Sequence, residues 1–394
     1  MLSELTVEQI RSFRLRSHHL NAFSQPEEIP EIAGACGLQN SPPGAWESAV
    51  HIRVPALSLS DLEHLLYEEK TLLQAWSLRG APMVFPAQDS GIFLSALIPH
   101  EEESWIYTQG ILLALDFLQM SFNELLELLK QVMPLLDQET ILSKTALDQT
   151  LAQWMLPLIP AEKRELWNSP SMYGNPKVQT VGGAVVSFLL RPCAFLGLVV
   201  FGRRTATSPS FTSYKNWTGH SFNSPEDAGK ELVRRFLHCY GPATADSFLS
   251  WLGCCGSQGR RLWESVCEET ETLKVFGKKA CYLAKDREAL FSPASFEREL
   301  LLLGAHDPYL DQHDRLILQP DKTLHRQIWK TVSNPGAIIY QGKISGIWTC
   351  NKQSKGLAIR MTLWDDLPVK EKLYGLAEEY AGFRKLKLED CEII

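Results

Sequence analysis

The segment between residues 224 and 284 constrains the fold more than any other part of this 394-residue chain. Apolar side chains recur every four residues from Ala228 to Tyr240 and stop at Gly241, which predicts a helix with one buried face. The next segment, GPATADSFLSWLG, begins with Thr244 as a helix cap, and SQGRRLWESVCEE continues with a third helical pattern. ETLKVFGKKACYLA then predicts two short strands around its FGKK turn. Three helices and a β-hairpin in this order form a winged helix, a fold that can present its third helix to a DNA groove.

Capping signals mark helix starts along the chain. A Ser or Thr followed three residues later by Glu or Gln caps a helix N-terminus, and a Ser-Pro pair places proline in the first turn. The first pattern occurs at Thr6 with Gln9, Ser60 with Glu63 and Ser121 with Glu124, and the second at Ser224-Pro225 and Ser292-Pro293. We therefore expect five helices to begin at these positions.

The order of helices followed by strands can be traced twice more. Residues 6–90 give helical segments and then WSLRGAPMVFPAQD, which we interpret as a wing. Residues 121–202 give two helical stretches and then GGAVVSFLLRPCAFLGLVVFG. That segment is rich in Val, Leu and Phe and is broken by Pro192 and Gly197, so we expect paired strands there.

The last hundred residues have a different character. AIIYQGKISGIWTC and GLAIRMTLW are β-rich, with Gly342 at a turn, and a closing helix is expected near VKEKLYGLAEEYAGF. The predicted fold class is α+β, with three tandem winged-helix units followed by a small C-terminal β-rich domain. The predicted boundaries are 1–120, 121–215 and 216–295 for the three winged helices and 296–394 for the β-rich domain.

Composition places the chain among globular proteins. Hydrophobic residues make up 45% and charged residues 22%, and we find no long apolar run and no secretory signal. We therefore expect a soluble cytoplasmic protein that does not bind membranes. The nine cysteines form no C-x-x-C pair, which favours reduced thiols. His18 and His19 are adjacent and would point about 100° apart on a helix, so we expect no metal site.

The formal charge of −7 argues against a protein that binds polyanions over its whole surface. DNA affinity depends instead on the phosphates that one face neutralises, so local clusters of Arg and Lys matter more than the average. For each cluster the alternative is a solvated helix face, and for Arg79 it is a side chain lying along a core tryptophan, Trp76. The candidate DNA-binding residues are Arg14, Arg16, Arg79, Arg203, Arg204, Arg234, Arg235, Arg260, Arg261, Lys278 and Lys279.

Five segments together resemble a known family. They are RLRSHHL, GLQNSPPGAWESAVHIR, LLQAWSLRGAPMVFPAQD, EDAGKELVRRFLHCYGPATADSFLSWLG, and LLGAHDPYLDQHDRLIL with the downstream IIYQGKISGIW. In these segments the chain resembles the tandem winged-helix proteins that include the AlkZ-type DNA glycosylases, which unhook interstrand cross-links. The resemblance spans nearly the whole chain. It implies double-stranded DNA, alkylated or cross-linked, as the partner, and we expect no cofactor.

The resemblance also implies catalytic residues. The family's proposed motif is a Gln, one further residue, and then Gln or Asp, and it falls here on Gln39, Asn40 and Ser41, so that Ser41 departs from the pattern. A Gln amide can orient water and stabilise developing charge, and a Ser hydroxyl can hold water from a shorter arm. Asp307 in the DPYL segment is the third candidate, because a carboxylate could stabilise an oxocarbenium ion. Its structural alternative is a buried polar lock.

Three classes of function stay open at this point. The leading one is a DNA glycosylase that hydrolyses the N-glycosidic bond of alkylated or cross-linked purines. An N7-alkylated purine is already cationic and departs without a general acid, so a carboxylate pair is not required. The rival is a non-catalytic DNA-binding protein, a regulator or damage sensor, which Ser41 and the acidic pI favour. A protein-interaction module is the third.

Overall fold

The computed structural model describes residues 5–206, 208–311, 313–354 and 356–394. By their internal contacts the residues divide into two compact units, each assembled from segments far apart in the sequence. Unit 1 comprises the residues up to Leu65 together with Val233–Trp251 and Trp263–Ile394, and unit 2 comprises Leu66–Leu232 and Leu252–Leu262. The four domains expected from the sequence remain a prediction.

Unit 1 is built around a five-stranded sheet of strand order β13-β12-β11-β10-β9. The strands are β9 (Leu300–Leu303), β10 (Gly336–Tyr340), β11 (Lys343–Lys352), β12 (Gly356–Leu363) and β13 (Lys387–Ile393). Neighbours pair antiparallel, except that β13 runs parallel to β12. The predicted turn at Gly342 is confirmed, and this glycine has φ +73° between β10 and β11. Strands β9 and β13 were not predicted.

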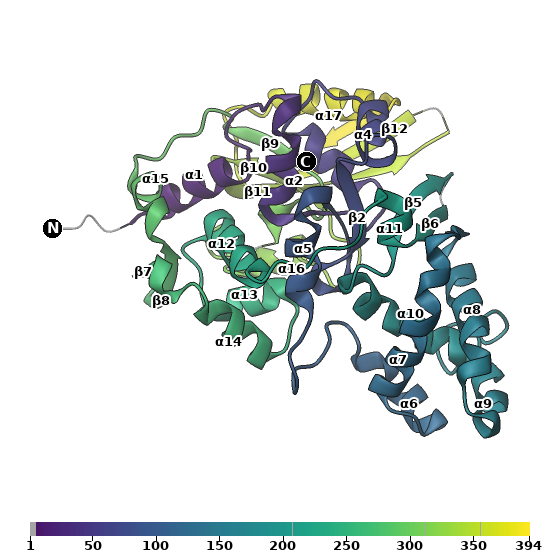
Figure 1. Cartoon of the computed structure of the whole chain (residues 1–394). Helices are drawn as coiled ribbons and strands as arrows, with labels where there is room; N and C mark the ends of the chain where they lie inside the picture. Colours follow the sequence, from purple (N-terminus) through teal and green to yellow (C-terminus); the bar gives the residue numbers. More distant parts are fainter. Residues whose placement is uncertain (1–4, 207, 312, 355) are drawn as a thin grey trace. The chain divides into compact units, whose positions relative to one another are not determined.

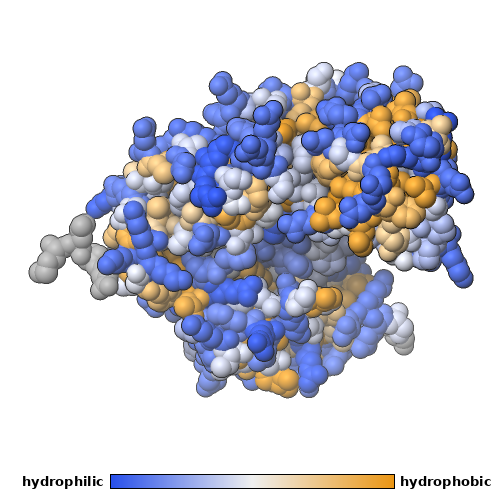
Figure 2. Space-filling view, turned by 90° about the horizontal axis from the view of Figure 1, so that it is seen from below, coloured by the Kyte–Doolittle hydropathy of each residue, from blue (hydrophilic) through white to orange (hydrophobic). Residues whose placement is uncertain are grey.

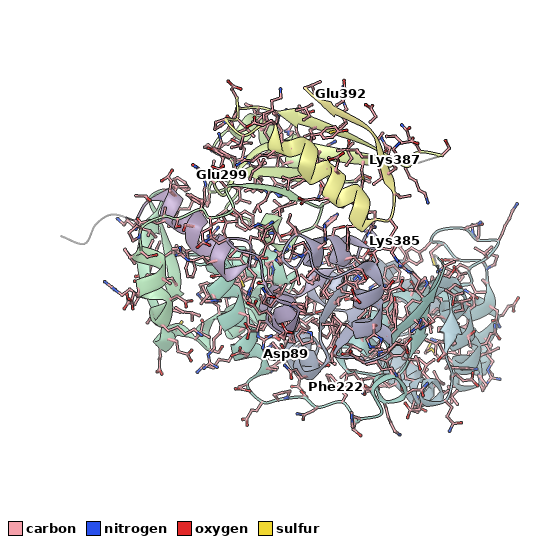
Figure 3. The ribbon with its side chains drawn as sticks, turned by 90° about the horizontal axis from the view of Figure 1, so that it is seen from above. Asp89, Phe222, Glu299, Lys385, Lys387 and Glu392 are labelled. Carbon is pink, nitrogen blue, oxygen red and sulfur yellow. The ribbon has the colours of Figure 1, made fainter. Side chains whose placement is uncertain are left out.

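Both faces of this sheet are covered. Helix α17 (Lys372–Phe383) packs on one face, where Leu373 and Ala377 join Leu302 in one hydrophobic cluster. Figure 3 shows α17 beside the sheet, with Lys385 in the turn that leads from the helix into β13. Leu303 belongs to a second cluster on the opposite face, together with Leu15 of α1 (Val7–Ser17). The closing helix is confirmed, but β13 follows it.

The predicted order of three helices and a hairpin is present (Figure 1). The elements are α12 (Ala228–Tyr240), α13 (Ala245–Leu252), α14 (Gly256–Glu264), β7 (Thr270–Val275) and β8 (Lys278–Leu283). The predicted stripe from Ala228 to Tyr240 is buried, and Phe236 packs on the ring of Trp251 with centroids 5.2 Å apart. Thr244 caps α13, since its hydroxyl accepts a hydrogen bond from the Ser247 N–H at 3.2 Å.

Shorter helices complete unit 1. They are α2 (Ile29–Cys36), α3 (Ala45–His51), the larger part of α4 (Leu59–Tyr67), α15 (Arg287–Phe291) and α16 (His325–Ile328). The capping box of Thr6 and Gln9 on α1 is confirmed. The box expected at Ser60 is wrong, because α4 is capped two residues earlier, where Ser58 and Asp61 exchange backbone and side-chain hydrogen bonds.

Both Ser-Pro predictions are wrong. Helix α12 begins at Ala228, three residues after Pro225, whose carbonyl accepts a hydrogen bond from the Ala228 N–H at 3.2 Å. Ser292 ends a helix instead of starting one, because it is the C-terminal cap of α15. A Ser-Pro pair suits any turn that keeps the serine extended, and it therefore does not distinguish the two ends of a helix.

Unit 2 combines helices with two small groups of paired strands. Its helices are α5 (Ser90–Phe93), α6 (Leu112–Leu118), α7 (Phe122–Val132), α8 (Lys144–Met155), α9 (Arg164–Asn168), α10 (Val181–Phe195), α11 (Tyr214–Thr218) and the larger part of α14. Its strands are β2 (Leu72–Trp76), β3 (Pro82–Pro86), β4 (Ile141–Leu142), β5 (Val200–Thr205) and β6 (Ser208–Thr212). Strands β2 and β3 form the hairpin expected around Gly80, and the capping box of Ser121 and Glu124 on α7 is confirmed.

The expectation of paired strands across 182–202 is wrong for most of that segment. Residues Val181–Phe195 form helix α10, and only β5 is extended. The helix is buried on nearly every side, so its sequence has no polar face to reveal a helical period. Gly182 belongs inside it because a Cβ there would lie 2.3 Å from the Trp167 ring. Pro192 is tolerated near its last turn.

Among the described residues, none of the helices is both long and apolar enough to cross a membrane. On the face seen in Figure 2, hydrophilic residues predominate and apolar residues form separate patches. In the same part of the chain, we find no group of three His, Cys, Asp or Glu side chains placed to hold a metal ion. All nine cysteines are described, and each is a thiol.

Candidate active site

Gln39 lies in unit 1, in the segment between two helices that we call the Gln39 loop, where Leu38–Gln39 form the short strand β1. Helix α2 ends at Gly37, which has φ +70°, and the buried Leu38 anchors the loop before Gln39. Asn40 is also buried, and its side-chain oxygen accepts a hydrogen bond from the Gly44 N–H at 2.7 Å. This bond closes the loop over Ser41, which is exposed, and leads the chain into α3.

The amide of Gln39 is held by two hydrogen bonds. Its Nε2 donates to the carbonyl oxygen of Ser41 at 3.0 Å and lies 3.1 Å from Nδ1 of His306. A glutamine amide nitrogen carries two N–H groups, so these contacts use both donors. The side-chain oxygen is a hydrogen-bond acceptor with two lone pairs, so it can accept a hydrogen bond from a water molecule.

His306 lies on the loop that follows strand β9. Its backbone has φ +64°, a left-handed conformation that is uncommon outside glycine. The next residue, Asp307, makes two hydrogen bonds within this loop. Its N–H donates to the Gly304 carbonyl at 3.2 Å, and its carboxylate accepts from the Tyr309 N–H at 3.0 Å. Strain at His306 next to a fixed residue is typical of functional sites.

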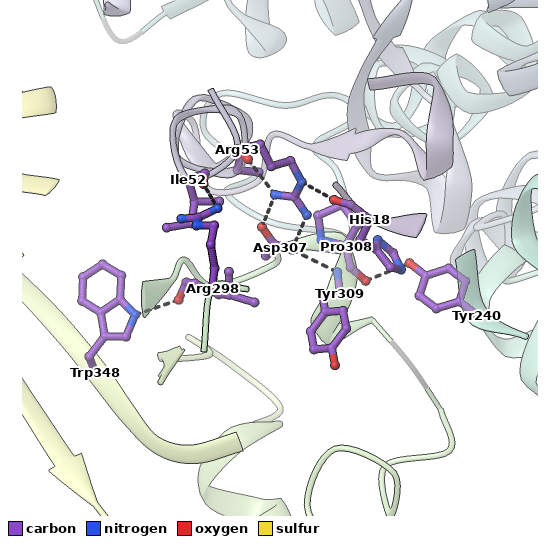
Figure 4. A network of polar contacts seen from close by, with 11 residues as sticks. His18, Ile52, Arg53, Tyr240, Arg298, Asp307, Pro308, Tyr309 and Trp348 are labelled. Carbon is purple, nitrogen blue, oxygen red and sulfur yellow. Dashed lines mark hydrogen bonds and ion pairs between the residues drawn. The ribbon is translucent and has the colours of Figure 1, made fainter. Parts of the chain in front are cut away.

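A buried ion pair joins the two loops. Arg53, two residues after α3, donates to both carboxylate oxygens of Asp307, at 2.7 and 3.0 Å. The side chains of Arg53 and Asp307 are 2% and 0% exposed. The guanidinium also donates to the carbonyl oxygens of His18 and Ala49, at 2.7 and 2.6 Å. Figure 4 shows this network, in which the Asp307 carboxylate is held by Arg53 and by the Tyr309 N–H.

Further hydrogen bonds extend from the same network. The Tyr240 hydroxyl at the end of α12 donates to the Pro308 carbonyl at 2.8 Å, and the Tyr309 hydroxyl donates to the Gly342 carbonyl at 2.9 Å. His18 lies between the two tyrosine rings, 4.9 and 5.6 Å from their centroids. Burial, and then the charge of Arg53, hold the pKa of His18 well below its usual value of 6.5. The imidazole is therefore neutral at pH 7.

A pocket of about 430 Å³ adjoins both loops. Pro42 and Gly44 contribute from the Gln39 loop, and Gly304 and Ala305 contribute from the His306 loop. Gly44 has φ +92°, and a Cβ there would lie 2.8 Å from the Arg384 guanidinium, which pairs with Glu47 at 2.7 Å. Small residues at these positions keep the space beside the Gln39 loop open.

The comparisons with known proteins place this geometry in a family. The family described as DNA glycosylase AlkZ-like matches residues 32–385. The chain belongs to the AlkZ-like DNA glycosylase family. The chain is also similar to the interstrand DNA cross-link repair glycosylase of Streptomyces sahachiroi, at 22% identity over 356 residues, which is 86% of each protein. The solved structure of the DNA glycosylase AlkZ from the same organism superposes with a TM-score of 0.76 at 19% identity, covering 99% of this chain and 100% of that one.

Segments that carry the likeness to the AlkZ-like family converge in unit 1. His18 comes from RLRSHHL, Arg53 from the end of GLQNSPPGAWESAVHIR, Tyr240 from the α12 segment, and Asp307 from DPYL. All four meet in the network of Figure 4. The segments are therefore joined by hydrogen bonds that fix the relative positions of the Gln39 and His306 loops.

Several of the arginines expected to bind DNA have internal partners. Arg14 is fully buried and donates to both oxygens of Asp314, at 3.0 and 2.6 Å, and to the carbonyls of Gly241 and Pro242. Three others form ion pairs with carboxylates, namely Arg203 with Glu68, Arg234 with Glu269 and Arg261 with Glu103. Two more donate to backbone carbonyls, Arg16 to that of Ala289 at 2.8 Å and Arg235 to that of Gly34 at 2.7 Å.

The remaining candidates are more accessible. Arg260, Lys278 and Lys279 are exposed, and Arg204 and Arg79 are half-buried. Arg79 has φ +56° and lines a pocket of about 480 Å³ in unit 2. Trp76, expected in the core, is buried there, and its ring stacks on Phe211 with centroids 5.3 Å apart.

Two residues of the site were not predicted from the sequence. His306 was not singled out, although it directly precedes Asp307, and Arg53 was quoted within a segment but given no role. His306 is 267 positions away from Gln39, and no local pattern links the two. A histidine beside a DPY turn is the only signal that could have drawn attention to it.

Proposed function

We propose that this protein is a monofunctional DNA glycosylase that releases alkylated or cross-linked purines from double-stranded DNA, on a scaffold of tandem winged helices. The observation that carries the proposal is the amide of Gln39, which is held by Ser41 and His306 in a loop whose residues Pro42 to Gly44 line a pocket. Membership of the AlkZ-like family supports it. The helix, helix, helix and hairpin order from α12 to β8 supports the winged-helix part.

The proposed reaction needs few catalytic groups from the protein. A water attacks C1′ of the sugar, the bond from C1′ to the base nitrogen breaks, and the base takes the bonding electrons, while the water proton passes to solvent. An N7-alkylpurine departs as a neutral base because its positive charge is cancelled by those electrons. The Gln39 oxygen accepts a hydrogen bond from the attacking water and stabilises the positive charge that develops on the sugar.

The pocket beside the loops supplies a place for the base. Its walls carry the rings of Trp348 and Tyr380, and the Trp348 N–H is held by the Leu303 carbonyl at 2.7 Å. Aromatic faces attract a cationic alkylpurine before the bond breaks. Asp307 acts in this proposal through Arg53 and the His306 loop, as a positioning residue.

A base-release assay tests the proposed function. Purified protein is incubated with duplexes that carry an N7-alkylguanine or a mustard-type cross-link, and abasic sites are counted over time. Wild type releases the base, and Gln39→Ala lowers the rate on the order of 100-fold while its melting temperature and DNA affinity are unchanged. Gln327→Ala, at an exposed position on α16, is the matched control and keeps the wild-type rate. Wild-type rates in Gln39→Ala would remove this residue from the mechanism.

A non-catalytic DNA-binding protein is the second candidate, and the exposed hydroxyl of Ser41 in place of the family's Gln or Asp favours it. Ser41→Gln separates the two candidates. The exposed position accepts a longer side chain, and a second amide improves the placement of water. A higher yield of abasic sites at unchanged DNA affinity supports a glycosylase. If neither wild type nor Ser41→Gln releases a base although both bind DNA, the non-catalytic candidate is favoured.

A further inference from the structure

A recess of about 380 Å³ in unit 1 lies outside the candidate active site. It is bounded by the β7–β8 hairpin, by the start of α13 at Thr244, and by the segment from His313 to His325. The hairpin turns through Phe276 and Gly277, which have φ +47° and +77° and form a tight two-residue turn.

Three positively charged side chains line this recess. Lys278 and Lys322 are exposed, and Arg315 is half-buried. Among the described residues, none of these three side chains has a hydrogen-bond or ion-pair partner, and the Arg315 guanidinium lies over the Trp329 ring at 4.7 Å. The carboxylate of Asp314 also lines the recess, but both of its oxygens accept hydrogen bonds from Arg14.

The balance of charge in the recess is therefore positive, in a chain whose formal charge is −7. The buried Arg14 offsets Asp314, which leaves the charges of Lys278, Arg315 and Lys322 without a carboxylate to neutralise them. Cations gathered in a recess raise the local concentration of anions. Two histidines, His313 and His325, also line the recess, and the Nε2 of His325 donates to the Gln319 carbonyl at 2.8 Å.

The recess also offers apolar surface beside these charges. Phe276 at the hairpin tip is 56% exposed, and Val275 and Leu316 line the walls. A ligand that combines an anionic group with a flat apolar ring would use both parts. A nucleic acid strand has this chemistry, because phosphates alternate along it with bases that stack on aromatic rings.

We propose that this recess binds a phosphodiester of a nucleic acid strand, with Lys278, Arg315 and Lys322 around the phosphate and Phe276 against the neighbouring base. The inference rests on the proposed function in that DNA is taken as the partner. It places a contact with the DNA backbone at the hairpin, away from the loop that carries Gln39. Arg315 and Lys322 were not among the residues expected to bind DNA.

The hairpin provides a matched control. Side chains alternate between the two faces of a strand, so Lys278 and Ala280 face the recess and Lys279 faces away. Lys279 pairs across the hairpin with Lys274, and Lys278 pairs with Val275. Lys278→Gln and Lys279→Gln remove the same charge from adjacent exposed positions. Only the first removes it from the recess.

The experiment measures DNA affinity by fluorescence anisotropy of a labelled duplex at several salt concentrations. Lys278→Gln and Lys322→Gln each lower the slope of log K against log salt by about one unit, because each loses one phosphate contact. Lys279→Gln keeps the wild-type slope.

Two results would overturn the proposal. One is an equal loss in Lys278→Gln and Lys279→Gln, which would mean that only the general charge of the hairpin matters. The other is calorimetric binding of a 5′-mononucleotide or inorganic phosphate to wild type that is lost in Lys278→Gln while DNA affinity is retained, which would assign the recess to a small phosphate ester. Failure of the proposed function gives a different pattern, in which wild type binds the duplex with the expected salt dependence and releases no base.

Discussion

The network around Asp307 and the recess beside the β7–β8 hairpin are both rich in charged side chains, but they use them in opposite ways. In the network, the Arg53 guanidinium is buried and is held by a carboxylate and by two backbone carbonyls. In the recess, Lys278 and Lys322 face solvent. Arginine in the network holds segments of the chain together, whereas the recess keeps its positive charge available to a ligand.

This difference bears on how basic clusters in a sequence are interpreted. Arg14 and Arg16 are two residues apart in the sequence and looked like one DNA-binding cluster. Arg14 is buried against Asp314, and Arg16 donates to the backbone of α15. A cluster of basic residues in the sequence therefore does not predict a basic surface. Each guanidinium has several hydrogen-bond donors, and acceptors within the fold can satisfy all of them.

The largest effect is expected for Asp307→Asn. The change leaves the buried Arg53 charge without its carboxylate, and breaking a buried ion pair costs about 3–5 kcal/mol in the free energy of unfolding. Asp365→Asn makes the same chemical change in the partly exposed pair of Lys343 and Asp365, and it costs at most about 1 kcal/mol. Urea unfolding of both variants measures the difference.

A contrary result for Asp307→Asn would be informative. If the variant unfolds at the same urea concentration as wild type but no longer releases a base, Asp307 acts in the chemistry and the network is not a structural lock.

A smaller effect on stability is expected when the pH is lowered. The pKa of His18 is lowered in the folded state by burial and by Arg53, so below about pH 6.5 the unfolded chain takes up a proton that the folded chain does not. Stability from this group is fully present above pH 6.5 and is lost as the pH falls toward the lowered pKa, at up to about 1.4 kcal/mol per pH unit. His18→Phe removes this contribution.

The measurement compares the free energy of unfolding of wild type and His18→Phe at pH 7.5 and pH 5.5. On going from pH 7.5 to pH 5.5, the free energy of unfolding is expected to fall more in wild type than in His18→Phe. The pKa of His238 is raised by its hydrogen bond to Asp286, and this opposite contribution is present in both proteins and cancels in the comparison. A pH-independent difference would mean that His18 is not protected from protonation.

The smallest effect on stability is expected in the recess. Lys278→Gln changes an exposed side chain, so the free energy of unfolding stays within about 0.5 kcal/mol of wild type. The same variant is expected to weaken DNA binding. A loss of more than 1 kcal/mol in thermal or urea unfolding would show that Lys278 supports the hairpin, and the contrast between the two regions would then disappear.

Much of the fold could be predicted where burial is one-sided. The stripe from Ala228 to Tyr240 has a buried face and a polar face, so the sequence shows its helical period. Helix α10 lacks that signal because it is buried on nearly every side, and its Val and Leu residues suggested strands. Strand β13 has the reverse difficulty, since it is mostly exposed at the edge of the sheet and carries charges from Lys387 to Glu392 (Figure 3).

The candidate site was predictable only in part. Gln39 was found through a resemblance, and no property of an isolated glutamine would have selected it. His306 and Arg53 come from other segments, and only the folded chain brings them to the Gln39 loop. For Asp307 the sequence left two roles open, because a carboxylate that stabilises a cation on the substrate and one that stabilises an arginine within the fold have the same letter. The burial of the Asp307 carboxylate against Arg53 favours the structural role.

Strand β13 has a consequence for handling the protein. It covers the ladder of backbone N–H and carbonyl groups along β12, to which it is hydrogen-bonded in parallel. A premature stop codon before Lys387 would leave that ladder open, and an uncovered strand edge is a template on which other chains can add. Such truncated products are expected to precipitate or to be degraded in the cell.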